Sequence, residues 1–198
     1  MKIYDISQEL LSCEVYEGDP RPCAVKLSGI DEGAPYNLSA FSMCAHNGTH
    51  IDAPYHFIPT GDAVDKIELK KLIGYAYVCR HEGDFTSDDA TRVLKIAEKS
   101  GLGAEKRILI AGNSAVTLEA ARTFSESGIF LLGSESQTVG PKDAPMAVHK
   151  ALLSHGAVLL EGVRLSEIDE GVYLLSAPPL NIAGFDGAPC RAVLIDLE

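Results

Sequence analysis

The chain has 198 residues, 46% of them apolar and 23% charged, which is typical of a globular protein rather than a disordered one. Twenty-eight acidic side chains against seventeen basic ones give a net charge of −11 with neutral histidines, which argues against nucleic acid or an anionic membrane as a partner. No apolar run approaches the roughly 18–20 residues of a membrane span, and the N-terminus lacks the apolar core of a signal peptide. We therefore expect one domain over residues 1–198, without membrane contact.

The cysteines indicate the redox environment of the protein. The five cysteines are scattered along the chain, odd in number and without a Cys-x-x-Cys pair. This pattern is typical of reduced thiols and not of a disulfide framework or a structural zinc site. We expect a cytoplasmic protein.

The predicted elements begin with short strands and turns and continue as helices that alternate with buried strands. The expected strands, in chain order, cover residues 2–6, 24–27, 74–80, 107–111, 129–132, 157–160, 172–176 and 192–196, with an extended stretch at 38–45. The expected helices cover residues 87–100, 117–127 and 145–154, with a helical turn at 69–73. Glycine and proline predict turns at residues 16–22 and 31–35.

Local signals support the helix over 87–100 and the strand over 107–111. The helix has acidic side chains in its first turn, although Ser87 followed by Ala90 lacks the full capping box, and Gly101 ends it. The strand contains Ile-Leu-Ile, a continuous apolar run of the kind that is buried on both faces. Alternating helices and buried strands indicate an α/β fold with a first half richer in β structure.

The chemistry of the chain is concentrated in residues 44–57. Three of the six histidines and one aspartate lie within this stretch: His46, His50, Asp52 and His56. These side chains bind divalent metals or transfer protons near neutral pH. The pattern predicts a metal or acid/base site, because a lone histidine is usually only a hydrogen-bonded polar residue, whereas this stretch holds several.

The spacing of these residues requires a bent chain. A straight strand would place all four on one face but spread them over roughly 33 Å, at about 3.3 Å per residue. A single metal ion needs ligand atoms roughly 2 Å away, so the chain must turn. Gly48 can adopt a left-handed or bulged conformation, and Pro54 disfavours helix at Ala53. We expect a bent loop or strand that carries a metal site.

Two distant residues are candidates for a second part of this site. His149 shares a helical stripe with Leu152 and Leu153, so it should lie on the buried face of its helix. Glu161 closes an apolar strand, where a buried carboxylate needs a positive partner. A metal ion would be such a partner, and so would Arg164, so the residues leave both readings of Glu161 open.

The motif resembles that of a known family. His-Asn-Gly-Thr-His-Ile-Asp-Ala-Pro-Tyr-His, residues 46–56, is similar to the HxGTHxDxPxH signature of the metal-dependent cyclase family, which includes bacterial kynurenine formamidase (arylformamidase) and isatin hydrolase. The resemblance implies a swivelling β/β/α fold with a mixed sheet and flanking helices. It also implies a homo-oligomer, either a dimer or a tetramer.

The resemblance further implies roles for individual residues. Carried over residue by residue, the implied metal ligands are His46, His50, Asp52, His149 and Glu161. Asp52 would bridge two metal ions, and His56 would be the general acid/base instead of a ligand. The cofactor would be divalent zinc or manganese, with one or two ions per chain.

Two stretches depart from the family pattern. Tyr16 lies in Tyr-Glu-Gly-Asp, where kynurenine formamidases place a tryptophan before Pro-Gly-Asp, and this chain contains no tryptophan. Residues 133–138 differ from the Gly-x-Asp-x-x-Ser of many members. Neither departure affects the metal ligands, and Tyr16 remains a candidate for contact with an aromatic substrate.

These observations predict a metal-dependent amidohydrolase that acts on a small N-formyl or cyclic amide. The metal ion would activate water, and His56 would move the proton to the leaving nitrogen. One alternative is a non-catalytic member that binds a metal and a small ligand. Another is a nucleophilic enzyme that uses Cys44 beside His46, although no oxyanion loop is recognisable for it.

Overall fold

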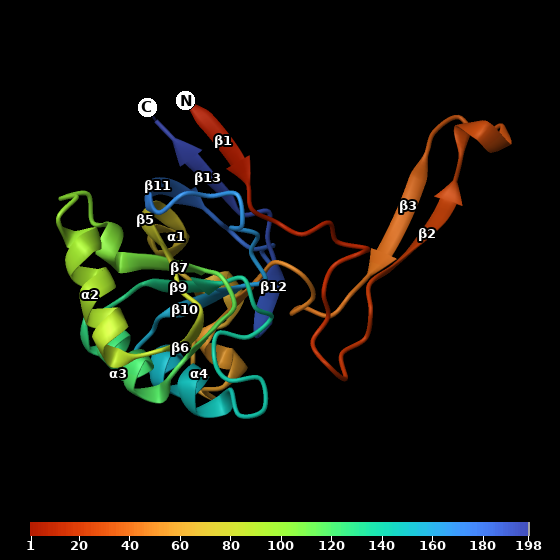
Figure 1. Cartoon of the computed structure of the whole chain (residues 1–198). Helices are drawn as coiled ribbons and strands as arrows, with labels where there is room; N and C mark the ends of the chain where they lie inside the picture. Colours follow the sequence, from red (N-terminus) through yellow and green to blue (C-terminus); the bar gives the residue numbers. More distant parts are fainter. Residues whose placement is uncertain (198) are drawn as a thin grey trace.

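The computed structural model describes residues 1–197, and its centre is a nine-stranded sheet with the order β1-β13-β11-β5-β7-β9-β10-β4-β12 (Figure 1). Its strands are β1 (Lys2–Asp5), β4 (His50–Asp52), β5 (Ile73–Arg80), β7 (Arg107–Ala111), β9 (Leu131–Ser134), β10 (Val158–Glu161), β11 (Gly171–Ser176), β12 (Gly187–Pro189) and β13 (Val193–Asp196). Two further pairs lie outside it: β2 (Cys23–Ser28) with β3 (Leu38–Ser42), and β6 (Gly83–Phe85) with β8 (Ser114–Val116).

Four α-helices accompany these strands: α1 (Leu69–Leu72), α2 (Ser87–Glu98), α3 (Leu118–Glu126) and α4 (Met146–Leu153). Short 3₁₀ turns lie at Ile30–Glu32, Pro54–His56, Val64–Lys66 and Ala104–Lys106. No helix within residues 1–197 combines the length and the apolar character needed to cross a membrane.

The sheet is mixed, as expected for the predicted α/β class. The strands β5, β7, β9 and β10 run parallel to their neighbours in this central block, and helices α3 and α4 form the crossovers between β7, β9 and β10. Antiparallel strands complete both edges. The prediction of a mixed sheet with flanking helices is confirmed.

Strand β7 shows how the two faces of the sheet are filled. Ile108 and Ile110 pack with buried side chains of α2, α3 and α4, whereas Leu109 and Ala111 point to a second apolar cluster on the opposite face. The second cluster includes Leu175 of β11, because the sheet curls over this face. The expectation of a strand buried on both faces is therefore confirmed, and all of β7 is buried.

Helix α2 begins differently from the sequence-based expectation. Thr86, not Ser87, is the N-cap: its hydroxyl accepts from the Asp89 backbone, and the Asp89 side chain accepts from the Thr86 backbone. The expectation of an incomplete capping box was therefore wrong by one residue, because Thr86 is extended and Ser87 already lies in the first turn. Gly101 follows the helix in a left-handed conformation, with φ +67°, as predicted.

The strand expected at 129–132 also lies further along the chain. Ile129 is still bonded to the end of α3, since its amide donates to the Phe124 carbonyl, and β9 begins only at Leu131. The three-residue strands β4 and β12 were not separately predicted, because such short segments carry too little periodicity. Strand β4 nevertheless carries two residues of the candidate site, His50 and Asp52, and β12 pairs with it.

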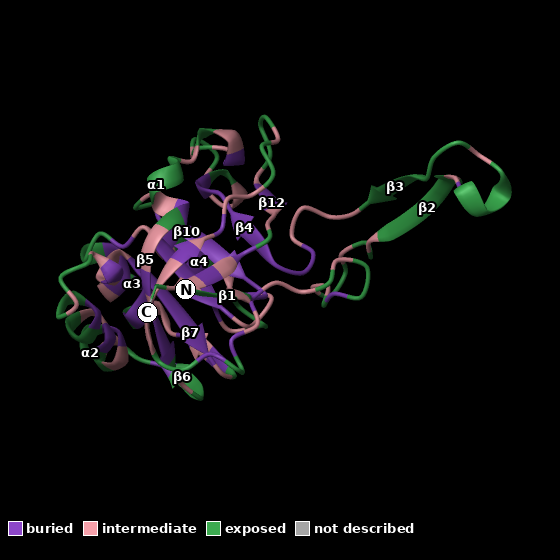
Figure 2. Cartoon of the chain, turned by 90° about the horizontal axis from the view of Figure 1, so that it is seen from above, coloured by how far each residue is buried: buried purple, intermediate pink, exposed green. Residues whose placement is uncertain are grey.

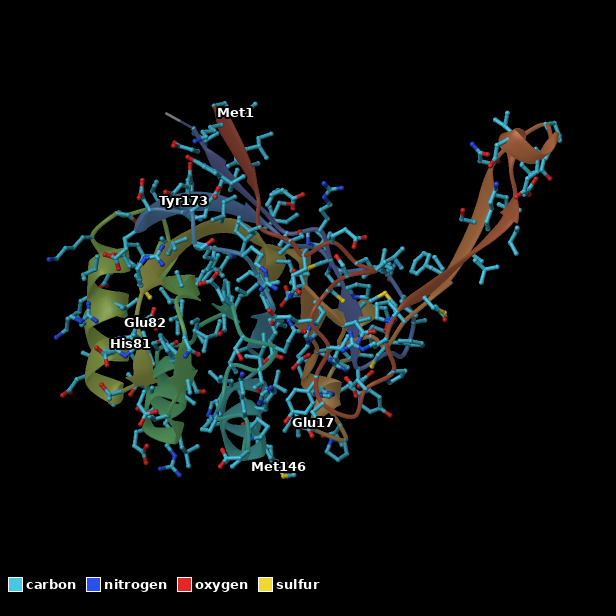
Figure 3. The ribbon with its side chains drawn as sticks, turned by 45° about the vertical axis from the view of Figure 1, so that its right-hand side comes forward. Met1, Glu17, His81, Glu82, Met146 and Tyr173 are labelled. Atoms are coloured by element: carbon cyan, nitrogen blue, oxygen red, sulfur yellow. The ribbon has the colours of Figure 1, made fainter. Side chains whose placement is uncertain are left out.

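Residues 23–42, which we call the arm, project away from the body of the molecule (Figures 1 and 3). Strands β2 and β3 pair only with each other, and nearly all their residues are exposed (Figure 2). The arm joins the body through residues 13–22 on one side and 43–49 on the other. Both connections lead directly to the residues of the candidate site.

Candidate metal centre

The histidine-rich motif is bent, as its spacing predicted. Gly48 has φ +64°, and a Cβ atom at this position would lie 2.9 Å from Cys13 Cβ, so both conformation and space favour glycine. The turn at Gly48 precedes β4, which begins at His50. Ala53 is extended, and Pro54 then starts a 3₁₀ turn that ends at His56.

Strand pairing brings the distant carboxylate to the motif. Strand β4 lies between β10 and β12, and its register with β10 places Glu161 opposite His50. The helix before β10 then delivers His149, whose Nε2 lies 3.1 Å from Glu161 Oε1. His149 is 3% exposed, so the prediction that it lies on the buried face of its helix is confirmed.

All five expected metal ligands meet in one cluster. They form two groups, each with ligand atoms within 4.8 Å of one another: His46, His50 and Asp52 in the first, and Asp52, His149 and Glu161 in the second. Asp52 belongs to both groups. Its Oδ1 lies 2.8 Å from His46 Nδ1 and 3.3 Å from His50 Nε2.

Backbone carbonyls set the orientation of two of the rings. His50 Nδ1 lies 3.0 Å from the Gly48 carbonyl oxygen, and His149 Nδ1 lies 2.9 Å from that of Pro145. Because a carbonyl only accepts, each Nδ1 carries the proton and donates it. Each Nε2 therefore faces the carboxylates with its lone pair when the ring is neutral, which is the form that binds a metal ion.

One atom at the centre of the cluster tests whether a metal ion fits. Asp52 Oδ2 is buried and has no hydrogen-bond donor among residues 1–197, and His149 Nε2 approaches it only to 3.5 Å. A buried carboxylate oxygen without a donor is costly. A divalent cation between Asp52, His149 and Glu161 would satisfy it, and nitrogen with carboxylate oxygen is a donor set suited to zinc or manganese.

The cluster holds protons when no metal is bound. Burial disfavours the charged form of His50, but the Asp52 and Glu161 carboxylates outweigh it and raise the pKa of His50 to about 10. Burial likewise opposes charge on His149, but Glu161 raises its pKa to about 9. Burial alone would raise the pKa of Asp52, yet hydrogen bonds from His46 and His50 hold it well below its usual value. Without a bound cation, the carboxylates therefore favour the protonated, positively charged forms of His50 and His149.

Metal uptake should therefore release protons. His50 and His149, with pKa values of about 10 and about 9, are charged at pH 7.5 and must lose their protons to become ligands. We expect up to about two protons to be released per chain, with an apparent metal affinity that rises with pH from about 7 towards 10. Calorimetry of Zn²⁺ binding in buffers of different ionisation enthalpy measures this number. Binding without proton release would contradict the charged state of the rings.

His56 lies beside the cluster but outside its two main groups. Its ring centroid is 4.1 Å from that of His46, and its side chain is 26% exposed. It lines a cavity of about 270 Å³ together with the five candidate ligands. Phe57 packs against the His56 ring and, partly buried, against the apolar core. His56 thus lies at the wall of the cavity, next to the five candidate ligands.

Asp186 is a residue of the site that sequence reasoning missed. Its Oδ2 lies 2.9 Å from His46 Nε2 and 3.1 Å from His56 Nδ1. Burial opposes the charged carboxylate, but hydrogen bonds from the two rings lower the pKa of Asp186. The only signal in the sequence is that Asp186 directly precedes Gly-Ala-Pro-Cys-Arg, residues 187–191, a stretch that also resembles the cyclase family.

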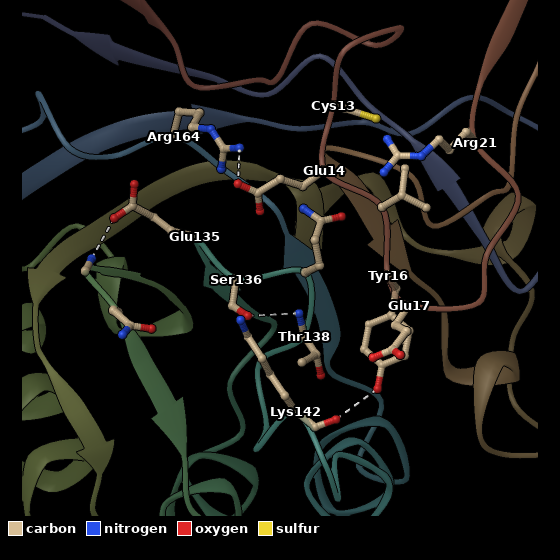
Figure 4. Close-up of a pocket in the computed structure, with 14 residues that line it drawn as sticks. Cys13, Glu14, Tyr16, Glu17, Arg21, Glu135, Ser136, Thr138, Lys142 and Arg164 are labelled. Carbon is tan, nitrogen blue, oxygen red and sulfur yellow. Dashed lines mark hydrogen bonds and ion pairs between the residues drawn. The ribbon is translucent and has the colours of Figure 1, made fainter.

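Tyr16 lies at the junction of two cavities. It lines the metal-site cavity and also a larger one of about 970 Å³, in which its hydroxyl donates to the Lys142 carbonyl (Figure 4). Gln137 and Thr138 line both cavities as well, and their side-chain polar atoms are buried without partners among residues 1–197. The structure thus brings Tyr16 to the candidate site, next to polar groups that a bound molecule would satisfy.

Two alternative readings lose support from the geometry. Arg164 pairs with Glu14 at 3.0 Å (Figure 4), so the reading in which Arg164 is the partner of Glu161 is wrong. Burial and the neighbouring Asp19 carboxylate raise the pKa of the Cys44 thiol, which disfavours the thiolate that a nucleophile needs.

Comparisons with known proteins agree with the fold and the site. The family model Cyclase matches residues 4–141. The chain is 30% identical to a kynurenine formamidase of Erythrobacter litoralis over 210 residues, covering 99% of this chain and 94% of that protein. It is 33% identical to a kynurenine formamidase of Salinibacter ruber over 180 residues, covering 84% and 83%.

Solved structures give the same result. A protein described as a potential metal-dependent hydrolase with cyclase activity has a TM-score of 0.79 and 28% identity, and the match covers 100% of this chain and 98% of that one. Isatin hydrolase A of Labrenzia aggregata has a TM-score of 0.82 at 21% identity, covering 100% and 94%, and supports the fold. The chain belongs to the cyclase family, and it is an amidohydrolase.

Proposed function

We propose that the protein hydrolyses a small N-formyl or cyclic amide with the help of one or two divalent metal ions. The observation that carries this proposal is the buried pair of ligand groups that share Asp52. The curated relatives are kynurenine formamidases, and isatin hydrolases share the fold, so opening of an amide bond is the reaction common to them.

His46, His50 and Asp52 would hold one ion, and His149 and Glu161 would hold a second with Asp52 between them. When bound, such ions activate water and polarise the carbonyl group of an amide. The protein surrounds this chemistry with a largely buried site: His50, Asp52, His149 and Glu161 are each at most 3% exposed. Exclusion of bulk water strengthens every electrostatic interaction there.

His56 is the proposed general acid/base. Its Nδ1 contacts Asp186 Oδ2, so its Nε2, which has no hydrogen-bond partner among residues 1–197, is free to exchange a proton in the cavity. An imidazole suits this task at neutral pH because it can both take a proton from water and give it to the leaving nitrogen.

The substrate would extend from the metal site into the larger cavity. A volume of about 270 Å³ suits a formyl or imide group, and the adjoining cavity of about 970 Å³ has room for the rest of a small molecule. Tyr16 offers an aromatic face at the junction. Because Tyr16 replaces the tryptophan of kynurenine formamidases, the proposal extends to amides other than the kynurenine type.

A substrate panel tests the proposal directly. Chelator-stripped protein, reconstituted with Zn²⁺ or with Mn²⁺, would be assayed against N-formyl anilines, cyclic imides and isatin. We expect hydrolysis of at least one class, no hydrolysis in the stripped protein, and recovery when metal is restored. Metal-replete protein that turns over none of these classes would instead favour the non-catalytic, ligand-binding alternative.

We also propose that the protein works as a homo-oligomer, with the arm as its contact surface. Six large apolar side chains of the arm are 46–60% exposed: Val25, Leu27, Ile30, Tyr36, Leu38 and Phe41. An isolated two-stranded hairpin is at best marginally stable in water, so an arm with such side chains needs a cover. In a dimer with a two-fold axis, the apolar side chains of each arm would be buried against the same surface of the other copy.

Substitutions in the arm should separate the copies. We expect Val25→Ser combined with Leu27→Ser to convert an oligomer into monomers, because both changes remove apolar contact area. The matched control is Leu69→Ser with Leu102→Ser, two leucines of the body that are 61% and 50% exposed. Sedimentation velocity at micromolar concentration gives the mass of each variant. A monomeric wild type, or separation by the control pair, would refute this role of the arm.

A further inference from the structure

We infer that Asp186 is a positioning residue that orients both the candidate metal ligand His46 and the candidate acid/base His56. A single carboxylate oxygen, Oδ2, contacts His46 Nε2 at 2.9 Å and His56 Nδ1 at 3.1 Å. Metal affinity and proton transfer would therefore both depend on one side chain. This inference rests on the proposed function for its second part, and on the ligand cluster alone for its first.

Strand pairing holds Asp186 at this point. It directly precedes β12, whose register with β4 sets Gly187 opposite Asp52, and the Ala53 amide donates to the Asp186 carbonyl at 2.9 Å. Gly187 leaves room for the His46 ring, since a Cβ there would lie 2.7 Å from His46 Cε1. The carboxylate is thus placed by a fixed backbone and not by a free loop.

The three candidate histidine ligands differ in the group that accepts a hydrogen bond from the ring nitrogen facing away from the metal site, the outer nitrogen. His50 and His149 each donate to a backbone carbonyl, whereas His46 contacts Asp52 through Nδ1 and Asp186 through Nε2. A carboxylate that accepts from the outer nitrogen of a ligating histidine fixes its tautomer and raises its basicity. With Nε2–H donated to Asp186, His46 presents Nδ1 to the site that it shares with Asp52.

The same oxygen has a second consequence for His56. Because Asp186 accepts from His56 Nδ1, it fixes the ring at the wall of the cavity and leaves Nε2 as the nitrogen that can exchange a proton. The His46 and His56 rings lie side by side, with centroids 4.1 Å apart. Asp186 therefore links the ring at the metal to the ring that moves the proton. Loss of the Asp186 charge should weaken metal binding through His46 and slow proton transfer through His56.

Asp186 could instead be a ligand itself, because His46, His56 and Asp186 also bring ligand atoms within 4.8 Å of one another. The burial of the groups favours the positioning role: the Asp186 side chain is 42% exposed, whereas that of Asp52 is 1% exposed. A carboxylate open to solvent on one side suits an outer partner of the ligands. The two roles differ in the number of bound ions that they predict.

The first experiment measures metal affinity without any substrate. Zn²⁺ would be titrated into chelator-stripped wild type, Asp186→Asn and Asp65→Asn. Asp65 accepts from the Gly184 amide at 3.0 Å, so its variant loosens the same loop without touching either ring. We expect Asp186→Asn to weaken one Zn²⁺ site about 10–100-fold with unchanged stoichiometry, and Asp65→Asn to remain near wild type.

The second experiment measures kcat at saturating metal in a double-mutant cycle. Asp186→Asn should lower kcat by about tenfold or more with little change in KM. In a His56→Ala background the same change should have no further effect on kcat, because the proton path is already lost, while the loss of Zn²⁺ affinity through His46 should persist. A merely structural role would lower kcat equally in both backgrounds.

Three outcomes would overturn the inference: wild-type Zn²⁺ affinity in Asp186→Asn, an equal loss of affinity in Asp65→Asn, or the loss of one bound ion per chain in Asp186→Asn. Failure of the proposed function would look different. In that case no amide would be hydrolysed by wild type, while the affinity difference between the Asp186 and Asp65 variants would still hold.

Discussion

Replacing Asp52 by asparagine is expected to remove bound divalent metal and, with it, amide hydrolysis. Asp52 is the one residue common to the two ligand groups described above, and one of its oxygens is buried without a hydrogen-bond donor among residues 1–197. Asparagine keeps the shape of the side chain but loses the charge that both sites use. We expect about two ions per chain to fall to fewer than one, and kcat/KM to fall by roughly three orders of magnitude or more.

Elemental analysis of gently purified protein checks the metal content, and thermal unfolding of the stripped proteins checks that the variant still folds. Asp62→Asn is the matched control, because Asp62 is an exposed carboxylate nearby that makes no side-chain contact with the cluster. Wild type with a single ion would argue against the pair His149 and Glu161. A variant that kept its metal would refute the shared role of Asp52.

Replacing His56 by alanine is expected to lower kcat sharply while the metal stays bound. The His56 ring lines the cavity but belongs to neither ligand group that contains Asp52. Loss of a general acid/base typically costs about 10²–10⁴ in rate, so we expect kcat to fall within this range. The metal content of the variant should equal that of wild type, because all five candidate ligands remain.

Steady-state kinetics and elemental analysis on the same preparations separate the two roles of His56. His155→Ala is the control, since His155 is exposed and hydrogen-bonded only around the end of its own helix. A His56→Ala variant that lost a metal ion would reassign His56 as a ligand. Unchanged kcat would exclude it from the reaction.

The sequence by itself identified most of the candidate site, because its residues lie in two short segments. His46, His50 and Asp52 lie within seven residues, where Gly48 and Pro54 dictate a bend. Periodicity predicts His149 on the buried face of its helix, and the apolar strand that follows ends at Glu161, but the residues alone left the partner of Glu161 open. The resemblance to the cyclase family implied that both are metal ligands. Local rules of chain geometry suffice for the bend of the motif and for the α/β class.

The tertiary structure decided which of these segments meet and what lies around them. Asp186 reaches the two rings only because β12 pairs with β4, and Glu161 faces His50 only through the register of β10 with β4. Arg164 forms an ion pair with Glu14, although Glu161 is much closer in sequence. Pairing between distant strands depends on the whole sheet, and no local pattern of residues encodes it.

The arm shows the same division between sequence and structure. Its sequence predicted two extended segments around a turn, and the structure has β2 and β3 there. That these strands leave the body, with their apolar side chains exposed, was not visible in the pattern, because alternation does not say which surface lies opposite a strand. The sequence thus determined the chemistry and the local conformations, whereas long-range packing alone determined the neighbours of each side chain.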